Sequence, residues 1–350
     1  MGGDGIANVT IKTIAARAGV SIGTVDRVIH NRDGVKPETR ELIQRICQDL
    51  GYQSDAIAKA LAFRKKEKHI AVIINAPERN LFSSRVKEGF DSVSETLNNY
   101  NIFFDYYLIK SHKTDEMVKI LEGLDKEAVA GIIIKPLVKP RVVQILRDFI
   151  GRGIPVITCT SDIPDLDTLC FVGQNHKKEG RIAAALLEKQ LNDGDKIAVI
   201  TGDLSVLARK EKAEGFIGHI RGCKKKIEIC ENLETINEED VIFAEAYSLL
   251  KRNPQIKALY THTPTIKPVI KAVRLLGMED LTVFTFGSLA DVKEDLLNGN
   301  LAFAIVEDAF RHGYDAGQIM FDYLFMGKEP SKKKMLLNSQ IMVDESVRES

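Results

Sequence analysis

The sequence predicts an α/β protein, with an N-terminal all-α helix-turn-helix head and a two-lobed, doubly wound parallel-sheet domain. Three observations predict this fold class. Residues 9–53 contain short amphipathic helices separated by glycine. From residue 70 onward, short and nearly continuous apolar runs alternate with helical stretches, as expected of strands covered on both faces. At 350 residues the chain is too long for one ordinary core, so more than one domain is expected.

Composition and cysteine usage bound the class of protein. The hydrophobic share of 44% and the charged share of 28% are ordinary for a globular protein. No apolar run reaches about 18 residues, so we expect no membrane-spanning helix. Residues 1–8 lack the basic start and apolar core of a signal peptide, and we expect them to form a disordered tail. Five cysteines, without a C-x-x-C pair, favour reduced thiols, a cytoplasmic location and no cysteine-based metal site.

The net charge of zero conceals an asymmetry along the chain. Residues 1–68 hold 12 Lys and Arg against 8 Asp and Glu, so the remaining residues hold 37 and 41 of the 49 residues of each sign. A small basic head on a mildly acidic body is a weak indication of nucleic-acid binding.

The head, residues 9–53, is expected to fold as three short helices. Thr10 is a candidate N-cap for the first helix, and Gly19 ends it because glycine tolerates a positive φ. Ser21 is a candidate N-cap for a second helix, whose N-terminal residues point outward. Residues 39–50 show a third amphipathic pattern. Two short helices joined at a glycine corner predict a helix-turn-helix, although a helical cap domain without a DNA role has the same pattern.

Residues 54–69 predict a hinge helix and a linker. The alanine-rich start favours a helix, which runs into the basic stretch RKKEK before the first strand. A basic segment that joins a helix-turn-helix to a second domain would lie close to a DNA backbone. Taken alone, the five residues are better interpreted as a solvated linker.

Residues 9–70 resemble the DNA-binding head of the LacI (lactose repressor) family, through TIKTIAARAGVSIGTVDRVI, VKPETRELIQRICQDLGY and AIAKALA. The resemblance implies that Ile22 and Gly23 contact base edges, with Arg27 one turn on. It implies that Leu61 wedges into the minor groove at the centre of a palindrome. It also implies a homodimer, since each head binds one half-site of double-stranded operator DNA. The residues expected to contact DNA are Thr10, Ser21, Ile22, Gly23, Thr24, Asp26, Arg27, His30, Asn31, Ala58 and Leu61.

Asp26 is unexpected on this second helix, because a carboxylate repels the phosphate backbone and many members of the family have serine there. It either orients Arg27 or another basic residue of the head, or accepts a hydrogen bond from a cytosine amino group. A third interpretation is that Asp26 lies off the DNA-facing side and favours the N-terminal half of the helix.

Ten apolar runs predict the strands of the body, and four stretches between them show clear helical spacing. The strands are expected at 70–75, 102–109, 130–136, 154–160, 170–174, 196–202, 227–233, 256–262, 281–286 and 301–306, and the helices at 83–98, 114–124, 178–191 and 265–276. Ligands of doubly wound sheets bind beyond the carboxyl ends of the strands, so the loops there are the candidate site.

The body resembles the type I periplasmic-binding-protein fold, which the LacI family carries as its effector domain. The matching segments include NLFSSRVKEGFD, GIPVITCTSDIP, FVGQNHKKEGRIAA, EKAEGF and GYDA. The resemblance implies two lobes joined by three crossings, which we expect near Ile163, Ser288 and Lys328. The domain at 70–345 would then divide into a lobe of 70–162 with 290–327 and a lobe of 163–289 with 328–345.

The same resemblance implies which residues line the cleft between the lobes. Asn80 and Phe82 match an N-x-F segment that offers a hydrogen bond and a stacking face, and Asp162 matches an acidic residue that accepts sugar hydroxyls. The expected effector-binding residues are Asn80, Phe82, Lys135, Asp162, Asn175, Arg209, Lys212, His262, Gly287 and Glu307. At most of these positions a surface loop residue without a ligand role is the alternative.

Four departures from the sugar-binding pattern favour a different effector. Ser83, Gly287, Lys212 and Glu307 stand where such members often carry an aromatic residue, aspartate, arginine and glutamine. These changes remove a stacking platform and a hydroxyl acceptor, while Lys135, Arg209, Lys212 and His262 bring donors toward one cleft. We therefore expect the effector to be a sugar or an acidic sugar derivative, such as a sugar acid or a sugar phosphate. The alternative is that local carboxylates pair with these cations.

Enzyme chemistry has no support in the motifs. We find no phosphate-cradling glycine motif, no G-x-S-x-G and no H-E-x-x-H, and the seven histidines show no metal-ligand spacing. We expect no enzyme activity, no cofactor and no metal.

The expected function is a transcriptional regulator, most simply a repressor, with operator DNA and a small sugar-like effector as partners. The alternative is a solute-binding receptor that uses the cleft alone. No heptad tail follows Met342, which favours a dimer over a tetramer.

Overall fold

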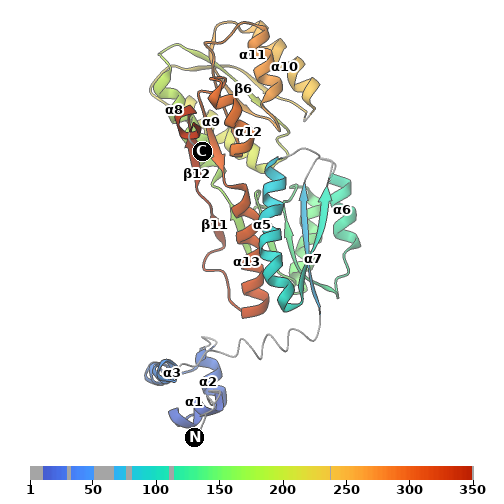
Figure 1. Cartoon of the computed structure of the whole chain (residues 1–350), viewed down its shortest axis with the longest axis vertical. Helices are drawn as coiled ribbons and strands as arrows, with labels where there is room; N and C mark the ends of the chain where they lie inside the picture. The colour runs from blue at the N-terminus through green and yellow to red at the C-terminus, as the bar shows by residue number, and fades with distance from the viewer. Residues whose placement is uncertain are drawn as a thin grey trace. The chain divides into compact units, whose positions relative to one another are not determined.

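The computed structural model describes residues 11–29, 33–50, 67–75, 81–109, 114–236 and 238–348. The chain divides into two compact units, Met1–Lys66 and Glu67–Ser350, which are drawn in Figure 1 and described separately below. Among the described helices, none is long and apolar enough to cross a membrane.

The first unit contains the three helices that the sequence predicts. They are α1 (Ile11–Ala18), α2 (Ile22–Ile29) and α3 (Pro37–Asp49). Ile14, Val25 and Ile43, one from each helix, are fully buried against one another in a small core. Gly19 has a φ of +65° at the corner between α1 and α2, which explains why glycine occupies this position. Helix α3 begins two residues earlier than predicted, because proline fits the first position of a helix.

Ser21 caps α2 as predicted, since its Oγ accepts a hydrogen bond of 3.1 Å from the N–H of Thr24. Several predicted DNA contacts lie outside the described residues, and these are Thr10, His30, Asn31, Ala58 and Leu61. Most of the predicted hinge helix and linker at 54–69 also lies outside them.

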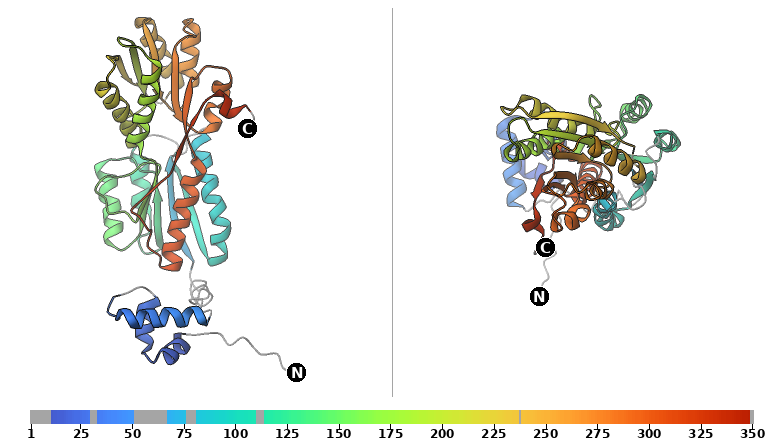
Figure 2. Two further views of the ribbon diagram at one scale, coloured as in Figure 1. Left: turned by 90° about the vertical axis from the view of Figure 1, so that its left-hand side faces the viewer. Right: turned by 90° about the horizontal axis from the view of Figure 1, so that it is seen from above.

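The second unit is built on two six-stranded sheets (Figures 1 and 2). The sheet of lobe 1 has the order β11-β5-β4-β3-β1-β2 and that of lobe 2 the order β12-β10-β9-β8-β6-β7. The strands are β1 (Lys68–Asn75), β2 (Ile102–Ile109), β3 (Val129–Ile134), β4 (Val156–Cys159), β5 (Cys170–Gly173), β6 (Lys196–Thr201), β7 (Glu228–Glu234), β8 (Ile256–His262), β9 (Thr282–Gly287), β10 (Phe303–Glu307), β11 (Lys334–Leu336) and β12 (Ser339–Met342). All described pairs are parallel except β10 with β12.

Helices cover both faces of each sheet, which confirms the predicted doubly wound architecture. In lobe 1, α5 and α13 lie on one face and α6 and α7 on the other; in lobe 2, α8 and α9 lie opposite α10 and α11. The helices are α5 (Leu81–Leu97), α6 (Thr114–Gly123), α7 (Pro140–Gly151), α8 (His176–Gln190), α9 (Leu207–Gly222), α10 (Glu239–Arg252), α11 (Lys267–Leu275), α12 (Leu289–Leu297) and α13 (Ala309–Phe321), with a π-helical turn at Asp322–Met326 and 3₁₀ turns at Asn98–Tyr100 and Asp344–Val347.

Glycine allows the two long helix pairs to pack backbone against backbone. A Cβ atom added at Gly180 of α8 would lie 2.0 Å from the carbonyl oxygen of Lys212 in α9. In lobe 1, a Cβ atom at Gly313 of α13 would lie 2.0 Å from the carbonyl oxygen of Val86 in α5. Neither helix pair could keep this spacing with a side chain at the contact.

The predicted crossings near Ile163, Ser288 and Lys328 are wrong. The chain passes between the sheets after Gly173, after Glu307 and after Leu336, and Figure 2 shows the C-terminal stretch running from one lobe into the other. The reason is backbone pairing: β5 still pairs with β4, β10 with β9 and β11 with β5. The segments 163–174 and 328–337 therefore belong to lobe 1, and 290–307 belongs to lobe 2.

Two strands were not predicted, β11 and β12. Both are short and most of their residues are exposed, so no long apolar run marks them in the sequence. They matter because they carry the third crossing and close one edge of each sheet.

Candidate ligand-binding cleft

A cavity of about 490 Å³ lies between the lobes and is lined from both of them. Lys135 follows β3 and Thr160 follows β4 in lobe 1, while His262, Gly287 and Glu307 end β8, β9 and β10 in lobe 2. The carboxyl ends of strands from both sheets thus converge on one cavity, as expected of this architecture.

The structure brings most of the predicted effector-binding residues together. Those that line the cavity are Phe82, Lys135, Arg209, Lys212, His262, Gly287 and Glu307. Asn80 lies outside the described residues. Asp162 and Asn175 do not line the cavity, and each has a structural partner instead.

Asp162 is held within lobe 1. Its carboxylate accepts hydrogen bonds of 2.9 Å from Thr158 Oγ1 and from the N–H of Ile163, and it pairs with Lys334 of β11 at 2.9 Å. Asn175 caps α8, since its Oδ1 accepts a 3.0 Å hydrogen bond from the N–H of Lys178. The two side chains fix the exit of β4 and the start of α8.

Two residues beside Asp162 line the cavity and were not predicted, Thr160 and Ser161. Their side chains are 5% and 1% exposed, and neither hydroxyl has a hydrogen-bond partner among the described residues. Thr160 also has a φ of +60°, which costs a β-branched residue about 1–3 kcal/mol. The surrounding structure holds Thr160 in this conformation, at a turn that lines the cavity. Nothing in the sequence marks it, except that the loop follows a strand.

A buried cluster of charges lies where the crossings meet. Lys212, which is 2% exposed, pairs with Glu307 and lies 3.4 Å from Glu179. His176 Nε2 donates a 2.8 Å hydrogen bond to the carbonyl oxygen of Thr160 in lobe 1, and its Nδ1 lies 3.3 Å from Glu179. His312 at the start of α13 lies 3.6 Å from Glu307. For Lys212 the alternative interpretation is therefore correct, because local carboxylates pair with it.

Electrostatics keeps Lys212 and Glu307 ionised. Burial alone would lower the pKa of Lys212, but Glu179 and Glu307 raise it above its ordinary value. Burial likewise opposes ionisation of Glu307, yet the charge of Lys212 holds the pKa of that carboxyl well below its usual range. His176, Glu179 and Glu307 have donor atoms within 4.8 Å of one another, but the ammonium of Lys212 already supplies the positive charge there.

The other basic residues of the cavity have lowered pKa values, in contrast to Lys212. Burial, followed by the charge of Arg209, lowers the pKa of Lys135 to about 8. Burial lowers the pKa of Arg209 to about 10. Burial and the charges of Lys212 and Arg209 hold the pKa of His262 well below its usual range, so the imidazole is neutral at pH 7. Its Nδ1 has no hydrogen-bond partner within the described part of the chain.

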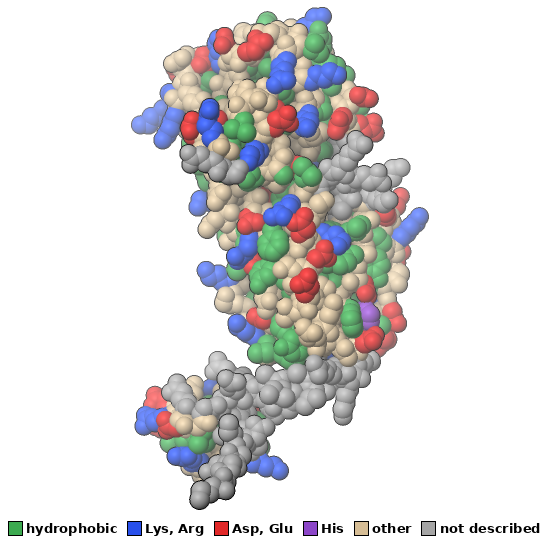
Figure 3. All heavy atoms as spheres, in the orientation of Figure 1, with side chains coloured by type: hydrophobic (Ala, Val, Ile, Leu, Met, Phe, Trp, Pro, Cys, Tyr) green, Lys and Arg blue, Asp and Glu red, His purple; other side chains and the backbone are tan. Residues whose placement is uncertain are grey.

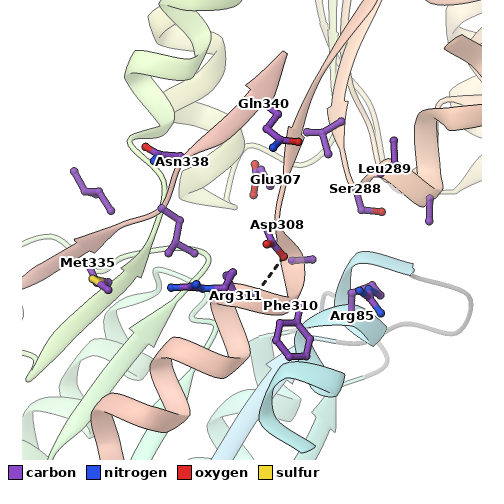
Figure 4. A pocket seen from close by; sticks show the side chains of 15 residues that line it. Arg85, Ser288, Leu289, Glu307, Asp308, Phe310, Arg311, Met335, Asn338 and Gln340 are labelled. Carbon is purple, nitrogen blue, oxygen red and sulfur yellow. Dashed lines mark hydrogen bonds between the residues drawn. The ribbon is translucent and has the colours of Figure 1, made fainter. Parts of the chain in front are cut away.

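A second cavity, of about 540 Å³, lies at the second and third crossings (Figure 4). Arg85 and Arg311 line it, and Figure 4 shows them below Asn338 and Gln340. Arg85 pairs with Glu88, and Arg311 lies 2.9 Å from Asp315. Because these cations already have carboxylate partners, we assign the first cavity as the candidate ligand site and call it the cleft.

The first unit presents one face of α2 to solvent. Ile22 is 49% exposed, and Gly23 and Arg27 are exposed with it, opposite the buried Val25 and Val28. Asp26 is half-buried and interacts with another group of the chain. The exposed face is the one that the sequence predicts to contact DNA.

The fold and the cleft define a two-lobed binding domain of the kind that encloses a small molecule, attached to a helix-turn-helix. Residues 70–329 match the family described as periplasmic binding protein domain, and residues 10–55 match that described as bacterial regulatory proteins, lacI family. The chain belongs to the LacI family of bacterial regulatory proteins, as its sequence motifs predict.

Relatives and solved structures agree with this assignment. Catabolite control protein A of Streptococcus mutans is 31% identical over 250 residues, which cover 70% of this chain and 69% of the relative. The ribose operon repressor of Halalkalibacterium halodurans is 24% identical over 294 residues, 80% of each chain. The glucose-galactose binding protein GanP of Geobacillus stearothermophilus matches with a TM-score of 0.73 and 23% identity, over 81% of this chain and all of that one. The structural likeness shows the fold.

Proposed function

We propose that this protein is a sequence-specific DNA-binding transcriptional regulator, acting as a repressor, whose operator affinity is set by a sugar-like effector in the cleft. The observation that carries the proposal is the presence in one chain of a lacI-family head and a two-lobed domain with a polar cleft. The names of the relatives, a catabolite control protein and a ribose operon repressor, support both parts of it.

The exposed start of α2 would supply the contacts to DNA. In this proposal two heads of a homodimer bind the half-sites of a palindromic operator, with Ile22 and Gly23 at base edges and Arg27 beside them. Acidic and basic side chains are interspersed over the face of the second unit in Figure 3, whereas residues 1–68 have a basic excess. The electrostatic attraction to phosphate is therefore expected to come from the head.

Effector binding would act through lobe closure. The cleft is lined from both lobes, so a ligand that contacts both sides favours one relative position of the lobes over another. The lobe position would set the spacing of the two heads in the dimer. Linkage requires operator DNA to change effector affinity by the same factor as effector changes operator affinity.

The test is retention of genomic DNA fragments by the purified full-length protein at increasing salt. We expect retention of specific fragments at low salt and a steep, roughly power-law loss of affinity as salt rises. A solute-binding receptor, which the likeness to GanP would fit, would retain no duplex at low salt with or without sugars. That result would reject the proposal.

Replacing Asp26 with serine is expected to strengthen DNA binding and to blur its selectivity. Removal of a carboxylate from a helix that faces phosphate should raise affinity for all duplexes by several-fold. Loss of the contact that Asp26 makes with a base or with Arg27 should relax selection at one base pair, by about 1–3 kcal/mol. Selection from random duplexes, run in parallel for both proteins, checks this. The matched control is Asp33→Ser, in the loop before α3. Unchanged affinity and unchanged selectivity would show that Asp26 has no part in recognition.

A further inference from the structure

Lys135 is a cation of the cleft that forms no ion pair with the described residues. It lies at the carboxyl end of β3 and its side chain is half-buried. No ion pair or hydrogen bond engages its Nζ within the described residues, and the ring of Phe82, 5.5 Å away, is its aromatic neighbour. Lys212, by contrast, has two carboxylates. A partly desolvated ammonium without an anion is unfavourable, and an anionic ligand would remove that cost.

Arg209 brings a second positive charge to the same cavity from the other lobe, although the carboxylate of Asp203 also acts on it. Lys135 belongs to lobe 1, whereas Arg209 lies in the first turn of α9 in lobe 2. Burial lowers the pKa of Lys135, and the charge of Arg209 lowers it further, so the two cations are close enough to repel each other. An anion between them would turn this repulsion into attraction and would draw the lobes together.

The carboxylates that also line the cleft have other partners or lie away from Lys135. Glu307 pairs with Lys212, and Asp291 accepts hydrogen bonds from the N–H and Oγ of Ser288. Glu294 lies 3.9 Å from Lys267 in an exposed pair. Glu239, in the first turn of α10, is exposed. The charge of Glu307 also acts on Lys135, but none of the four carboxylates forms an ion pair with it in the described part of the chain.

Thr160 and Ser161 add neutral donors to the lobe 1 side. Both hydroxyls are buried, line the cleft and have no hydrogen-bond partner among the described residues. Buried polar atoms in native proteins are nearly always paired, so two adjacent unpaired hydroxyls beside a cavity indicate groups that a ligand completes. They could donate hydrogen bonds to sugar hydroxyls or to the oxygen atoms of an anion.

We infer that the effector is a sugar derivative that carries an oxyanion, a carboxylate or a phosphate, and that the oxyanion binds between Lys135 and Arg209. This inference rests on the proposed function, and it names the chemical class of the effector. It also assigns the anion a role in lobe closure, since its two cationic partners lie on opposite lobes.

Calorimetric titration of the full-length protein tests the inference. The probes are D-glucose, D-galactose, D-mannose and D-ribose, each with its phosphate ester and its sugar acid, and inorganic phosphate alone. We expect at least one anionic member to bind more than tenfold more tightly than its neutral parent. The phosphate esters and the sugar acids distinguish the two oxyanions.

The decisive variant is Lys135→Gln, which keeps a hydrogen-bond donor and removes the charge. It should lower the affinity for the anionic ligand by about 10- to 100-fold and the affinity for its neutral parent by less than about threefold. The matched control is Lys210→Gln on the exposed face of α9, which should change neither.

The outcomes separate this inference from the proposed function. If neutral sugars bind as tightly as their anionic partners and Lys135→Gln affects both equally, the oxyanion assignment fails while a sugar-responsive regulator stands. If no sugar of either kind binds the folded protein, both the sugar-like effector and the oxyanion assignment fail. Binding of inorganic phosphate alone, without any sugar derivative, also overturns the inference.

Discussion

Replacing Lys212 with methionine is expected to destabilise the two-lobed unit by about 3–5 kcal/mol. The substitution conserves much of the packing but leaves Glu179 and Glu307 buried without their cation. Removing one partner of a buried ion pair is costly because the remaining charge stays desolvated. Urea unfolding at pH 7 measures the loss. The control is Lys210→Met, an exposed change on the same helix, which should cost less than about 0.5 kcal/mol.

The loss of stability in Lys212→Met is expected to depend on pH. In the native protein the pKa of Glu307 is held well below its usual range, so its contribution to stability is present above about pH 4.3 and is lost as pH falls below it. In Lys212→Met, burial without the cation would raise the pKa of Glu307, and acidification would neutralise this carboxyl. The difference in stability between variant and native protein should therefore shrink from pH 7 to pH 5.

Glu307→Gln provides the companion measurement. Combined with Lys212→Met, it should recover part of the lost stability, since it removes one of the uncompensated charges. Equal stabilities for Lys212→Met and Lys210→Met at pH 7 would contradict the interpretation of the cluster as a fully desolvated ion pair.

Replacing Arg27 with alanine is expected to weaken operator binding by about 1–3 kcal/mol for each head, or about 2–6 kcal/mol for a dimer with two. Arg27 is exposed on α2 beside Ile22 and Gly23, so its loss should leave the fold of the head intact. A base contact would also relax selectivity at one position of each half-site. A phosphate contact would weaken all sequences alike and would lower the slope of affinity against salt.

The matched control is Arg45→Ala on α3, which is also exposed but lies outside the predicted contact set. It should change operator affinity much less than Arg27→Ala, and circular dichroism should show both variants folded. Equal losses for the two variants would mean that affinity follows the charge of the head and not the position of Arg27.

The sequence predicts the fold in detail because its signals are local. Ser21 and Gly19 mark the ends of α1 and α2, and apolar runs mark β1 to β10. The crossings could not be placed, because whether β5 or β10 leaves a sheet depends on backbone pairing with strands distant in the chain. Strands β11 and β12 are too short and too exposed for an apolar run to identify them.

In the cleft, too, some residues could be predicted from the sequence and others could not. Lys135, Arg209 and His262 were expected from the family resemblance, and the structure places them in the lining of the cleft. The partners of Lys212 could not be predicted, because Glu179 and Glu307 come from α8 and β10, and only the packed structure brings them together. Asp162 was expected in the site, yet Thr160 and Ser161 line it, since the positive φ of Thr160 turns the chain toward the cavity.

The proposed regulation requires the cleft and the head to act on each other, and a coupled binding measurement tests this requirement. Operator duplex is first selected from a random pool, and its affinity for the full-length protein is then measured with and without a saturating sugar derivative that binds the cleft. We expect the effector to change operator affinity by about 5- to 150-fold. Operator should change effector affinity by the same factor. An operator affinity that stays the same while the cleft is saturated would contradict the proposed regulation.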